Sequence, residues 1–296
     1  MSNRQDLGDS NCGDGNANRC DARGNGEPVV TKVPIRYPGG KQRFLAQIIA
    51  HLPRADEIKG RFVEAFFGGG AVFFAFQPMP SVLNDRNPEL IDLYRGIRHD
   101  PEEVWRRFSA YPAGKRAYYK VRQQISRSWG VVAKAARTLY LNRTCFKGMW
   151  RQNSHGMFNV GYGGQSRRWA ISEVDLIAVA KALRGTKLTC SDFEPILDDT
   201  TAADFVFVDP PYHPGRRESR VEHYMFSQFT YGSHQRLACA LKRATRRGVR
   251  WAMTTSSHAD ITGLHKNARI LPFRAGVGDS PGKITRHTGE VLILNY

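Results

Sequence analysis

Apolar residues recur along this chain with two different spacings. Short apolar runs that end in glycine, an acid or proline are typical of strands buried in a parallel sheet. They predict strands at 61–66, 81–87, 186–193, 203–211 and 249–257, and a closing pair at 268–275 and 289–296. Apolar residues spaced three and four apart predict helices, and these cover 41–52, 71–77, 87–98, 102–145, 171–185 and 232–248.

This alternation of strands and helices predicts an α/β fold that is interrupted by a mainly helical insertion. Residues 1–30 are rich in Gly, Asn and Asp and contain few apolar residues, so we expect a disordered tail whose role the sequence does not indicate. The strand–helix pattern assigns 31–99 and 171–296 to the main domain. The inserted domain covers 100–170.

The composition narrows the class of partner. The chain has 296 residues, and its 44 Lys and Arg against 27 Asp and Glu give a net charge of +17. Such a charge favours a nucleic-acid partner, with an anionic membrane surface as the alternative. No apolar run reaches the ~20 residues that a membrane helix needs, and the cysteines form no CxxC pair. We therefore expect a cytoplasmic protein that has no membrane segment, metal site or disulfide framework.

A glycine turn separates the first predicted strand from the helix after it. In the stretch FFGGG, Gly68 to Gly70 allow the backbone to approach a ligand closely, as in nucleotide-binding βαβ units. Asp85 lies at the end of the next strand, near the spacing of ~20 residues at which an acid receives ribose hydroxyls. The turn is not G-x-G-x-x-G, so a tight turn for helix packing stays open as the alternative.

The stretch DFVFVDPPYHP at 204–214 leads from a buried strand directly into an acid and two prolines. An exocyclic amine on a nucleobase is a poor nucleophile because its lone pair is delocalised into the ring. Asp209 and the carbonyl of Pro210, held rigidly by the prolines, can accept its two N–H bonds and favour attack on an electrophilic methyl group. Tyr212 offers a ring for a stacked base, which must first leave the duplex. The alternative is a solvated acid where the prolines end the strand.

The predicted insertion carries most of the positive charge. From 101 to 170 the chain has 14 Lys or Arg against two acids, a net of +12, and no acid occurs between 104 and 172. A solvated helical face usually mixes both signs, whereas a basic block with interleaved aromatic residues suits a nucleic-acid surface. The aromatic residues are Trp105, Tyr118, Tyr119, Trp129, Phe146, Trp150 and Trp169.

Five motifs together resemble the Dam-type DNA adenine-N6 methyltransferases of bacteria and phages. They are PIRYPGGK (34–41), FVEAFFGGG (62–70), LNDRN (83–87), LNRTCFKGMWRQNSHGMFNVGYG (141–163) and DPPY (209–212). The resemblance covers about 34–296. It implies a Rossmann-like, S-adenosylmethionine-dependent methyltransferase fold with an inserted, mainly helical DNA-recognition domain. It also implies a monomeric, site-specific enzyme that methylates a flipped adenine in double-stranded DNA.

The resemblance further assigns roles to individual residues. The cofactor would be held at its methionine end by Tyr37 and Lys41, at its ribose by Asp85 and at its adenine by Asp192 and Phe193. Phe66, Gly68, Gly70 and Asp209 would complete the cofactor site. Asp209, Pro210 and Tyr212 would form the catalytic group. Phe146 would wedge into DNA and Arg151 would read guanine, while Arg36, Asn142, Lys147 and Asn153 would make further DNA contacts.

Two other functions stay open at this point. DPPY also fits cytosine-N4 methyltransferases, and a non-catalytic DNA-binding protein could keep the same fold. Well-known members of the family carry Trp at the position of Tyr37 and Lys at that of Arg36, so the recognised sequence need not be GATC. The sequence does not tell whether the protein accompanies a restriction enzyme, a chromosome or a phage genome.

Overall fold

A single sheet organises the protein. In this computed structural model the described residues are 31–37, 39–124, 128–153, 156–212, 229–275 and 286–296. Within them, seven strands follow the order β3-β2-β1-β4-β5-β7-β6. The strands from β3 to β5 in this order are parallel, whereas β7 runs antiparallel to β5 and β6. The bounds are β1 Phe62–Glu64, β2 Ser81–Asn84, β3 Lys187–Thr189, β4 Phe205–Val208, β5 Arg250–Ser256, β6 Arg269–Ala275 and β7 Arg286–Leu294.

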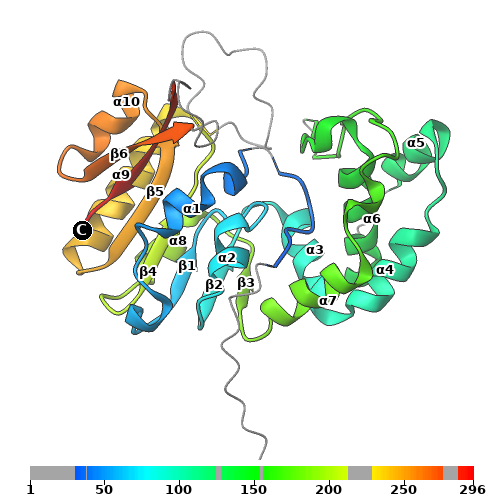
Figure 1. Cartoon of the computed structure of the whole chain (residues 1–296), viewed down its shortest axis with the longest axis horizontal. Helices are drawn as coiled ribbons and strands as arrows, with labels where there is room; N and C mark the ends of the chain where they lie inside the picture. Colours follow the sequence, from blue (N-terminus) through cyan, green and yellow to red (C-terminus); the bar gives the residue numbers. More distant parts are fainter. Residues whose placement is uncertain (1–30, 38, 125–127, 154–155, 213–228, 276–285) are drawn as a thin grey trace, which may run out of the picture.

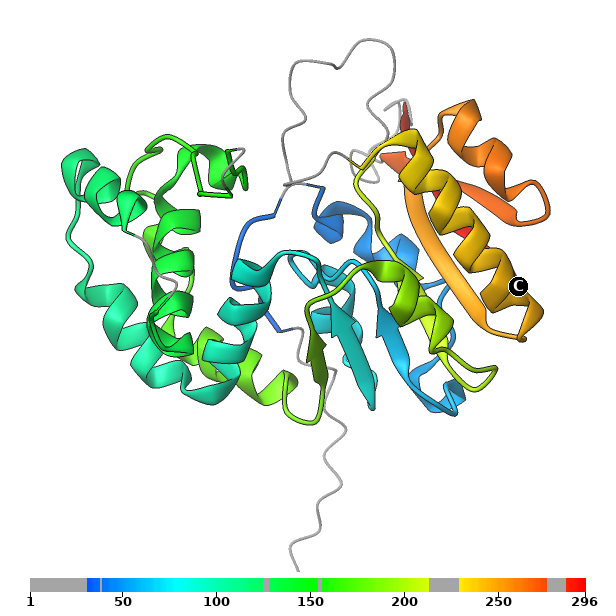
Figure 2. The ribbon, with the colours of Figure 1, turned by 180° about the vertical axis from the view of Figure 1, so that it is seen from behind.

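Helices cover both faces of this sheet (Figures 1 and 2). α1 (Leu45–Ile49) and α2 (Ala71–Phe76) lie on one face, and α8 (Phe193–Asp198) and α9 (Tyr231–Arg246) lie on the other. Alternate residues of β4 face opposite ways, so that Phe205 and Phe207 belong to one apolar cluster and Val206 to another. Burial on both faces explains why this strand reads as an unbroken apolar run.

Helices α3 to α7 form a lobe beside the sheet (Figure 1, right). α3 (Pro88–His99) packs along α6 (Val131–Thr144), and α7 (Glu173–Ala182) packs on α3 and α4 (Pro101–Ala110). The apolar cluster under the sheet continues through Leu93 of α3 to Leu139 of α6. α5 (Lys115–Gln123) and an irregular segment, described at 145–153 and 156–170, complete this lobe. The α/β fold with a mainly helical insertion is thus present, and the domain boundaries stay a prediction.

The sequence pattern was wrong in several details. The helix expected at 41–52 is a 3-10 turn at Lys41–Phe44 followed by only five residues of α1. The helical pattern expected at 102–145 is confirmed in α4, α5 and α6 of the described residues, and Gly114, with a φ of +99°, separates α4 from α5. Helix α8 and the short α10 (Ala259–Thr262) were not expected. The closing pair of strands is confirmed as β6 and β7, and the predicted tail lies outside the described residues.

Candidate active site and DNA interface

The chain reverses direction in the sheet between β1 and β4, which are parallel neighbours. From β1 the chain proceeds outward to β2 and β3, and from β4 it proceeds the other way to β5. In open α/β sheets, ligands bind at such a switch point, outside the carboxyl ends of the strands. The glycine turn follows β1, Asp85 follows β2 and Asp209 follows β4, so the topology brings these three predicted features to one edge.

The carboxylate of Asp85 is built into the glycine turn. One oxygen accepts the backbone N–H of Gly68 at 2.8 Å, and the other accepts that of Asn87 at 2.8 Å. The side chain is buried, and this burial raises the pKa of Asp85 to about 6, against the opposing effect of the two N–H bonds. Tyr94 secures the turn further, since its hydroxyl donates to the carbonyl of Gly68.

The glycines of this turn leave no room for side chains. Gly68 has a φ of +49° and Gly70 a φ of +71°, where a side chain causes strain. A Cβ on Gly68 would lie 3.0 Å from the ring of Tyr37, and a Cβ on Gly70 would lie 2.7 Å from Phe67. Tyr37 therefore packs directly on the turn, beside the ring of Trp150 at 6.2 Å. The glycine turn after β1 and the segment before α1, which carries Tyr37, therefore pack against each other.

Asp209 forms a buried ion pair with Lys41. The Lys41 ammonium lies 2.8 Å from Oδ1 of Asp209, and the two side chains are 4% and 20% exposed. The same ammonium donates to the carbonyl of Gly39 and lies 4.6 Å from the ring centre of Tyr212. Two residues that sequence reasoning missed complete this group: the hydroxyl of Thr254 donates to Asp209, and Glu290 accepts from the Tyr212 hydroxyl.

An aromatic patch borders the same edge. Phe66 stacks on Phe193 at 5.3 Å, and Phe229 contacts both rings. Asp192 caps helix α8, since its Oδ1 accepts the N–H of Glu194, and it also pairs with Arg236 at 2.7 Å. Asp192 and Phe193, the pair predicted to bind adenine, therefore lie beside Phe66 at this edge of the sheet. Oδ1 of Asp192 is already bonded to Glu194 and Arg236.

Glu64, at the end of β1, is a second carboxyl that sequence reasoning missed. It accepts the backbone N–H of Phe73, while its Oε2 is buried and has no hydrogen-bond partner among the described residues. Burial, with Asp209 nearby as the next cause, raises the pKa of Glu64 well above its usual range. The position of Glu64 directly before the glycine turn was the signal that could have identified it.

The predicted reading residues lie on an irregular hairpin. Bridges between Cys145 and Tyr162 and between Gln152 and Phe158 hold its two arms antiparallel. Phe146 is 50% exposed, and the Lys147 ammonium lies 5.3 Å from its ring centre. The hairpin thus presents an aromatic ring and a cation together.

The other two predicted residues of this hairpin bond across it. Arg151 donates from Nε to Oδ1 of Asn159 at 2.8 Å. Asn153 accepts the backbone N–H of Met157 at 2.9 Å. Arg151 is therefore held through Nε, and its two terminal nitrogens take no part in this bond. The Asn153 side chain stabilises the hairpin through its bond to Met157.

Asn142 is buried below the hairpin and bonds to the main chain. Its Oδ1 accepts the N–H of Arg36 at 2.9 Å, and its Nδ2 donates to the carbonyl of Arg36 at 2.7 Å. Arg143 donates to the carbonyl of Pro34 at 2.9 Å. The side chain of Arg36 packs over Gly148, where an added Cβ would meet it at 2.6 Å. Asn142 therefore positions Arg36 in this structure rather than presenting its amide at the surface.

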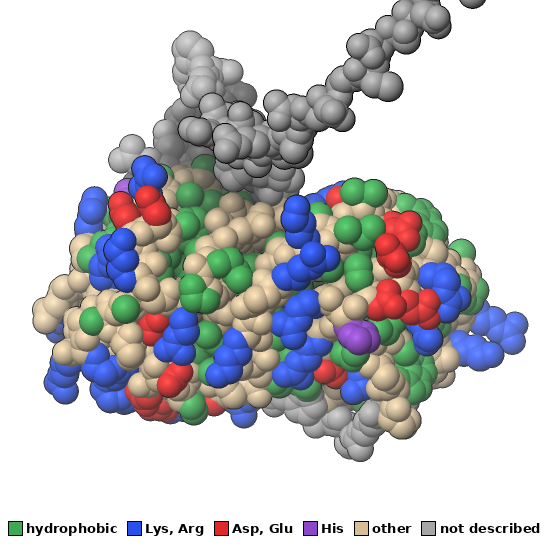
Figure 3. Space-filling model, turned by 90° about the horizontal axis from the view of Figure 1, so that it is seen from below, with side chains coloured by type: hydrophobic (Ala, Val, Ile, Leu, Met, Phe, Trp, Pro, Cys, Tyr) green, Lys and Arg blue, Asp and Glu red, His purple; other side chains and the backbone are tan. Residues whose placement is uncertain are grey.

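Part of the positive charge of the insertion is structural. Arg137, Arg143 and Arg168 are buried and donate to backbone carbonyls. Burial lowers the pKa of each guanidinium, that of Arg143 to about 10. On the face seen in Figure 3, Lys and Arg side chains are interspersed with Asp and Glu. Three of the cations counted in the insertion are therefore buried and do not contribute to its surface charge.

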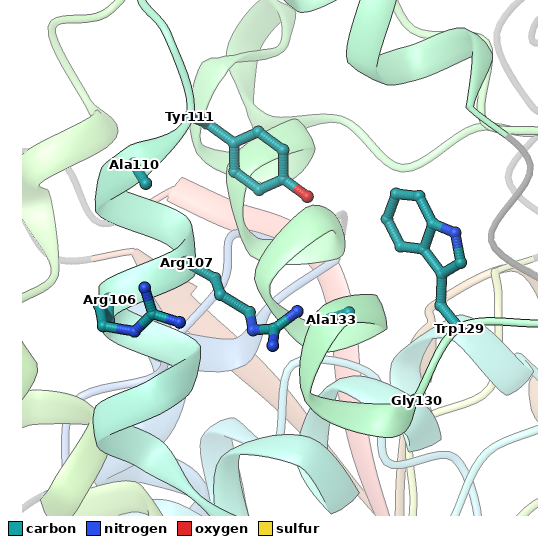
Figure 4. Close-up of a pocket in the computed structure, with 7 residues that line it drawn as sticks. All are labelled: Arg106, Arg107, Ala110, Tyr111, Trp129, Gly130 and Ala133. Carbon is teal, nitrogen blue, oxygen red and sulfur yellow. The ribbon is translucent and has the colours of Figure 1, made fainter.

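A cavity of about 510 Å³ lies in the insertion, between α4 and the start of α6. Arg107 extends into it from α4, and the ring of Trp129 faces it from the other side (Figure 4). Arg106 and Arg107 both pair with Glu103. None of the predicted catalytic or cofactor residues lines this cavity, so it is separate from the edge that carries Asp209.

Two kinds of feature are absent from the described residues. No His, Cys, Asp or Glu side chains there are grouped so that three or more could hold a metal ion. No helix in the same ranges is long and apolar enough to cross a membrane.

Comparison with known proteins identifies the family. Residues 37–275 match the model of the D12 class N6 adenine-specific DNA methyltransferases. A type II methyltransferase of Methanocaldococcus jannaschii is 30% identical, over 88% of this chain and 98% of that protein. One from Lactococcus lactis is 30% identical over 88% and 94% of the two chains. The DNA N-6-adenine-methyltransferase of Escherichia phage P1 is 30% identical over 81% of this chain and 32% of its own length.

These matches decide between the functions that the sequence left open. They name adenine-N6 methylation of DNA and not a cytosine-N4 or non-catalytic activity. The glycine turn, the acid after β2 and the DPPY motif after β4 meet at one edge of the sheet. The chain belongs to the D12 class N6 adenine-specific DNA methyltransferases and is an adenine-N6 DNA methyltransferase.

Proposed function

We propose that the enzyme takes its methyl group from S-adenosylmethionine, held at the carboxyl ends of β1, β2 and β4. The observation that supports this most directly is the turn at Gly68 and Gly70, which excludes side chains and lies against the buried carboxylate of Asp85. Each Asp85 oxygen accepts one N–H and keeps a lone pair for a ribose hydroxyl. Phe66 and Phe193 offer flat apolar faces to an adenine ring.

At the other end of this site, Tyr37 and Lys41 would hold the methionine portion. When bound, the cofactor supplies an electrophilic methyl group on a sulfonium. Asp209 and the carbonyl of Pro210 would accept the two N–H bonds of the target amine and draw it toward a tetrahedral shape. Tyr212 would stack on the flipped adenine. The contribution of the protein is positioning and electrostatic stabilisation, since none of these residues forms a covalent bond to the base.

The insertion would bind the duplex. We propose that Phe146 enters the base stack, that Arg151 reads a guanine and that Lys147 contacts the backbone. Arg36 would face the DNA from the position that Asn142 gives it, and Asn153 would support the hairpin that carries these residues. The enzyme would act as a monomer on double-stranded DNA. We place it in the cytoplasm because its substrate is DNA.

The test replaces the acceptor at the reacting centre. Asp209→Ala should lower the rate of methyl transfer by ~10²–10³, the usual value of one preorganised polar group, while affinity for DNA is largely kept. Transfer of labelled methyl to duplex DNA and nucleoside analysis of the product measure both rate and identity of the base. Asp260→Ala, which removes an exposed carboxylate on α10, is the control. Near wild-type turnover of Asp209→Ala would disprove the mechanism.

A further inference from the structure

The register of the sheet places Asp209 beside a buried threonine of β5. Val208, the last residue of β4, pairs with Met253, so the next residue on each strand is Asp209 and Thr254. Thr254 is fully buried, and its hydroxyl donates to Oδ1 of Asp209 at 2.6 Å. A short bond to an ionised carboxylate is stronger than a neutral one. The orientation of the Asp209 carboxylate is therefore set by a neighbouring strand as well as by the prolines.

The two oxygens of Asp209 have different surroundings. Oδ1 receives the Thr254 hydroxyl and the Lys41 ammonium at 2.8 Å. A carboxylate oxygen has two lone pairs, so these two donors occupy Oδ1. Among the described residues no donor bonds to Oδ2, and the Asp209 side chain is 20% exposed. Oδ2 is thus the oxygen that remains to accept an amine N–H.

The ring of Tyr212 is fixed from the same side of the sheet. Its hydroxyl donates to Oε2 of Glu290 at 2.8 Å and also interacts with Thr254. Glu290 of β7 pairs with Ser256 of β5, two residues beyond Thr254. Residues two apart on a strand share a face, so Thr254 and Glu290 lie on one face of the sheet. They connect the acceptor and the aromatic ring of the DPPY motif.

We propose that Thr254 and Glu290 are positioning residues for methyl transfer. Thr254 holds the Asp209 carboxylate so that Oδ2 faces the target amine, and Glu290 holds the Tyr212 ring in the orientation that stacks the base. This inference rests on the role proposed above for Asp209. It gives the antiparallel β5–β7 pair a part in the reaction that the DPPY motif alone does not indicate.

Adjacent threonines of β5 provide a matched test. Thr255 is also fully buried, but its side chain lies on the opposite face and its hydroxyl has no partner within the described residues. Thr254→Val and Thr255→Val remove one hydroxyl each from the same strand at nearly equal volume. Single-turnover methylation at saturating cofactor and DNA reports the chemical step, and separate titrations report the two affinities.

Thr254→Val should lower the single-turnover rate roughly tenfold or more, because a misplacement of 1 Å at a reacting group can cost ~10²-fold. Both affinities should stay within about twofold, since this change acts on the transition state alone. Thr254→Ser, which keeps the hydroxyl, should restore the rate, and Thr255→Val should match wild type. Equal effects of the two valine variants would overturn the positioning role of Thr254.

A double-mutant cycle tests the second residue. Tyr212→Phe and Glu290→Ala each break the same hydrogen bond and keep the aromatic ring, so the double variant should be no slower than the slower single variant. Additive losses would overturn the role of Glu290. Because Tyr212 and Glu290 are partly exposed, their variants should fold. The cycle therefore tests the role of Glu290 even if Thr254→Val does not fold.

Asp209→Ala separates failure of this inference from failure of the proposed function. If Asp209→Ala is inactive while Thr254→Val and the Glu290 cycle behave as wild type, the catalytic role of Asp209 stands and the positioning proposal is wrong. If Asp209→Ala keeps wild-type turnover, the proposed mechanism and this inference are both wrong.

Discussion

The side-chain amide of Asn142 holds the backbone of Arg36 through both its N–H and its carbonyl, at 2.9 and 2.7 Å. The two residues are 106 positions apart in the chain. Asn142 lies in the last turn of α6, next to the hairpin that carries Phe146 and Arg151. Arg36 directly precedes Tyr37, which packs on the glycine turn. One buried amide therefore connects the insertion to the segment that packs on the glycine turn.

We expect Asn142→Ala to weaken cofactor binding in the absence of DNA. The change leaves the partly buried N–H and carbonyl of Arg36 without the Asn142 amide, at a cost of up to ~1–3 kcal/mol for each group, and releases the segment that carries Tyr37. Calorimetric titration of the free enzyme with S-adenosylmethionine should show affinity reduced about tenfold. Asn153→Ala, which removes a side chain that accepts the N–H of Met157 within the hairpin, is the control and should bind the cofactor normally.

A direct contact between Asn142 and a base would give the opposite result. Cofactor affinity would then be unchanged without DNA, and only discrimination between DNA sequences would fall. That outcome would show that DNA binding moves the Asn142 amide away from Arg36.

The pH dependence of cofactor binding should follow Asp85. Its folded pKa of about 6 lies above the ordinary value of 3.8 because the carboxyl is buried. The ionised form is the better acceptor for ribose hydroxyls, so affinity should be full above pH 6. Below this value it should fall by about tenfold per pH unit, as proton linkage requires. Titrations between pH 5 and 8 measure the midpoint.

The raised pKa of Asp85 also determines how its contribution to the stability of the fold changes with pH. A raised folded pKa means that the Asp85 contribution favours the folded state below its unfolded pKa and is lost as the pH rises through about 6. Cofactor affinity and this contribution to stability therefore change in opposite directions. Asp85→Asn cannot titrate, so it should give weak binding without a midpoint near pH 6. A midpoint that persists in this variant would assign the titration to another group.

The sequence predicted the main parts of the site because they depend on strand ends. Carboxyl ends of parallel strands meet at one edge, so Asp85, Asp209 and the glycine turn could be brought together from their order alone. Thr254 and Glu290 could not be found in this way, because their contacts depend on the register of β5 with β4 and β7.

Charge counting alone could not locate the exposed cations, for a different physical reason. It cannot distinguish an arginine that faces DNA from one that satisfies buried carbonyls, as Arg168 does for Phe108 and Ser109. Helix α8 was missed because six residues give less than two turns of periodicity. Its N-cap, Asp192, was instead assigned a ligand by the family resemblance.

Exposed and buried cations of the insertion should behave differently in salt. Lys115, Arg116 and Lys120 are exposed on α5, which contains no acid. Replacing all three with Ala should lower the slope of log affinity against log salt by ~0.9 for each lost phosphate contact. Fluorescence anisotropy with duplex DNA between low and high salt gives the slope.

Arg168→Met is the contrasting variant. It should leave the salt slope unchanged but lower the free energy of unfolding by about 2–3 kcal/mol, because buried carbonyls lose their donor. A reduced slope in Arg168→Met, or an unchanged slope in the triple variant, would contradict this division of the charge.

Arg151 should determine a single guanine in the target. Its Nε is held by Asn159, which leaves the two terminal nitrogens for the paired acceptors of guanine, O6 and N7. A good bidentate contact discriminates by ~1–3 kcal/mol against the wrong base. Arg151→Ala should therefore relax the target at one guanine position more than it weakens binding to unrelated DNA, and Asn159→Ala should relax the same position to a smaller extent.

The measurement is methylation of every single-base variant of the target by wild type, Arg151→Ala and Lys147→Ala. Lys147 is exposed on the same hairpin and carries a point charge suited to phosphate, so its loss should lower activity by a similar factor on every variant. If Arg151→Ala shows that uniform pattern too, Arg151 contacts the DNA backbone and another residue reads the base. If Asn159→Ala relaxes a different position, Asn159 makes a contact of its own and does not orient Arg151.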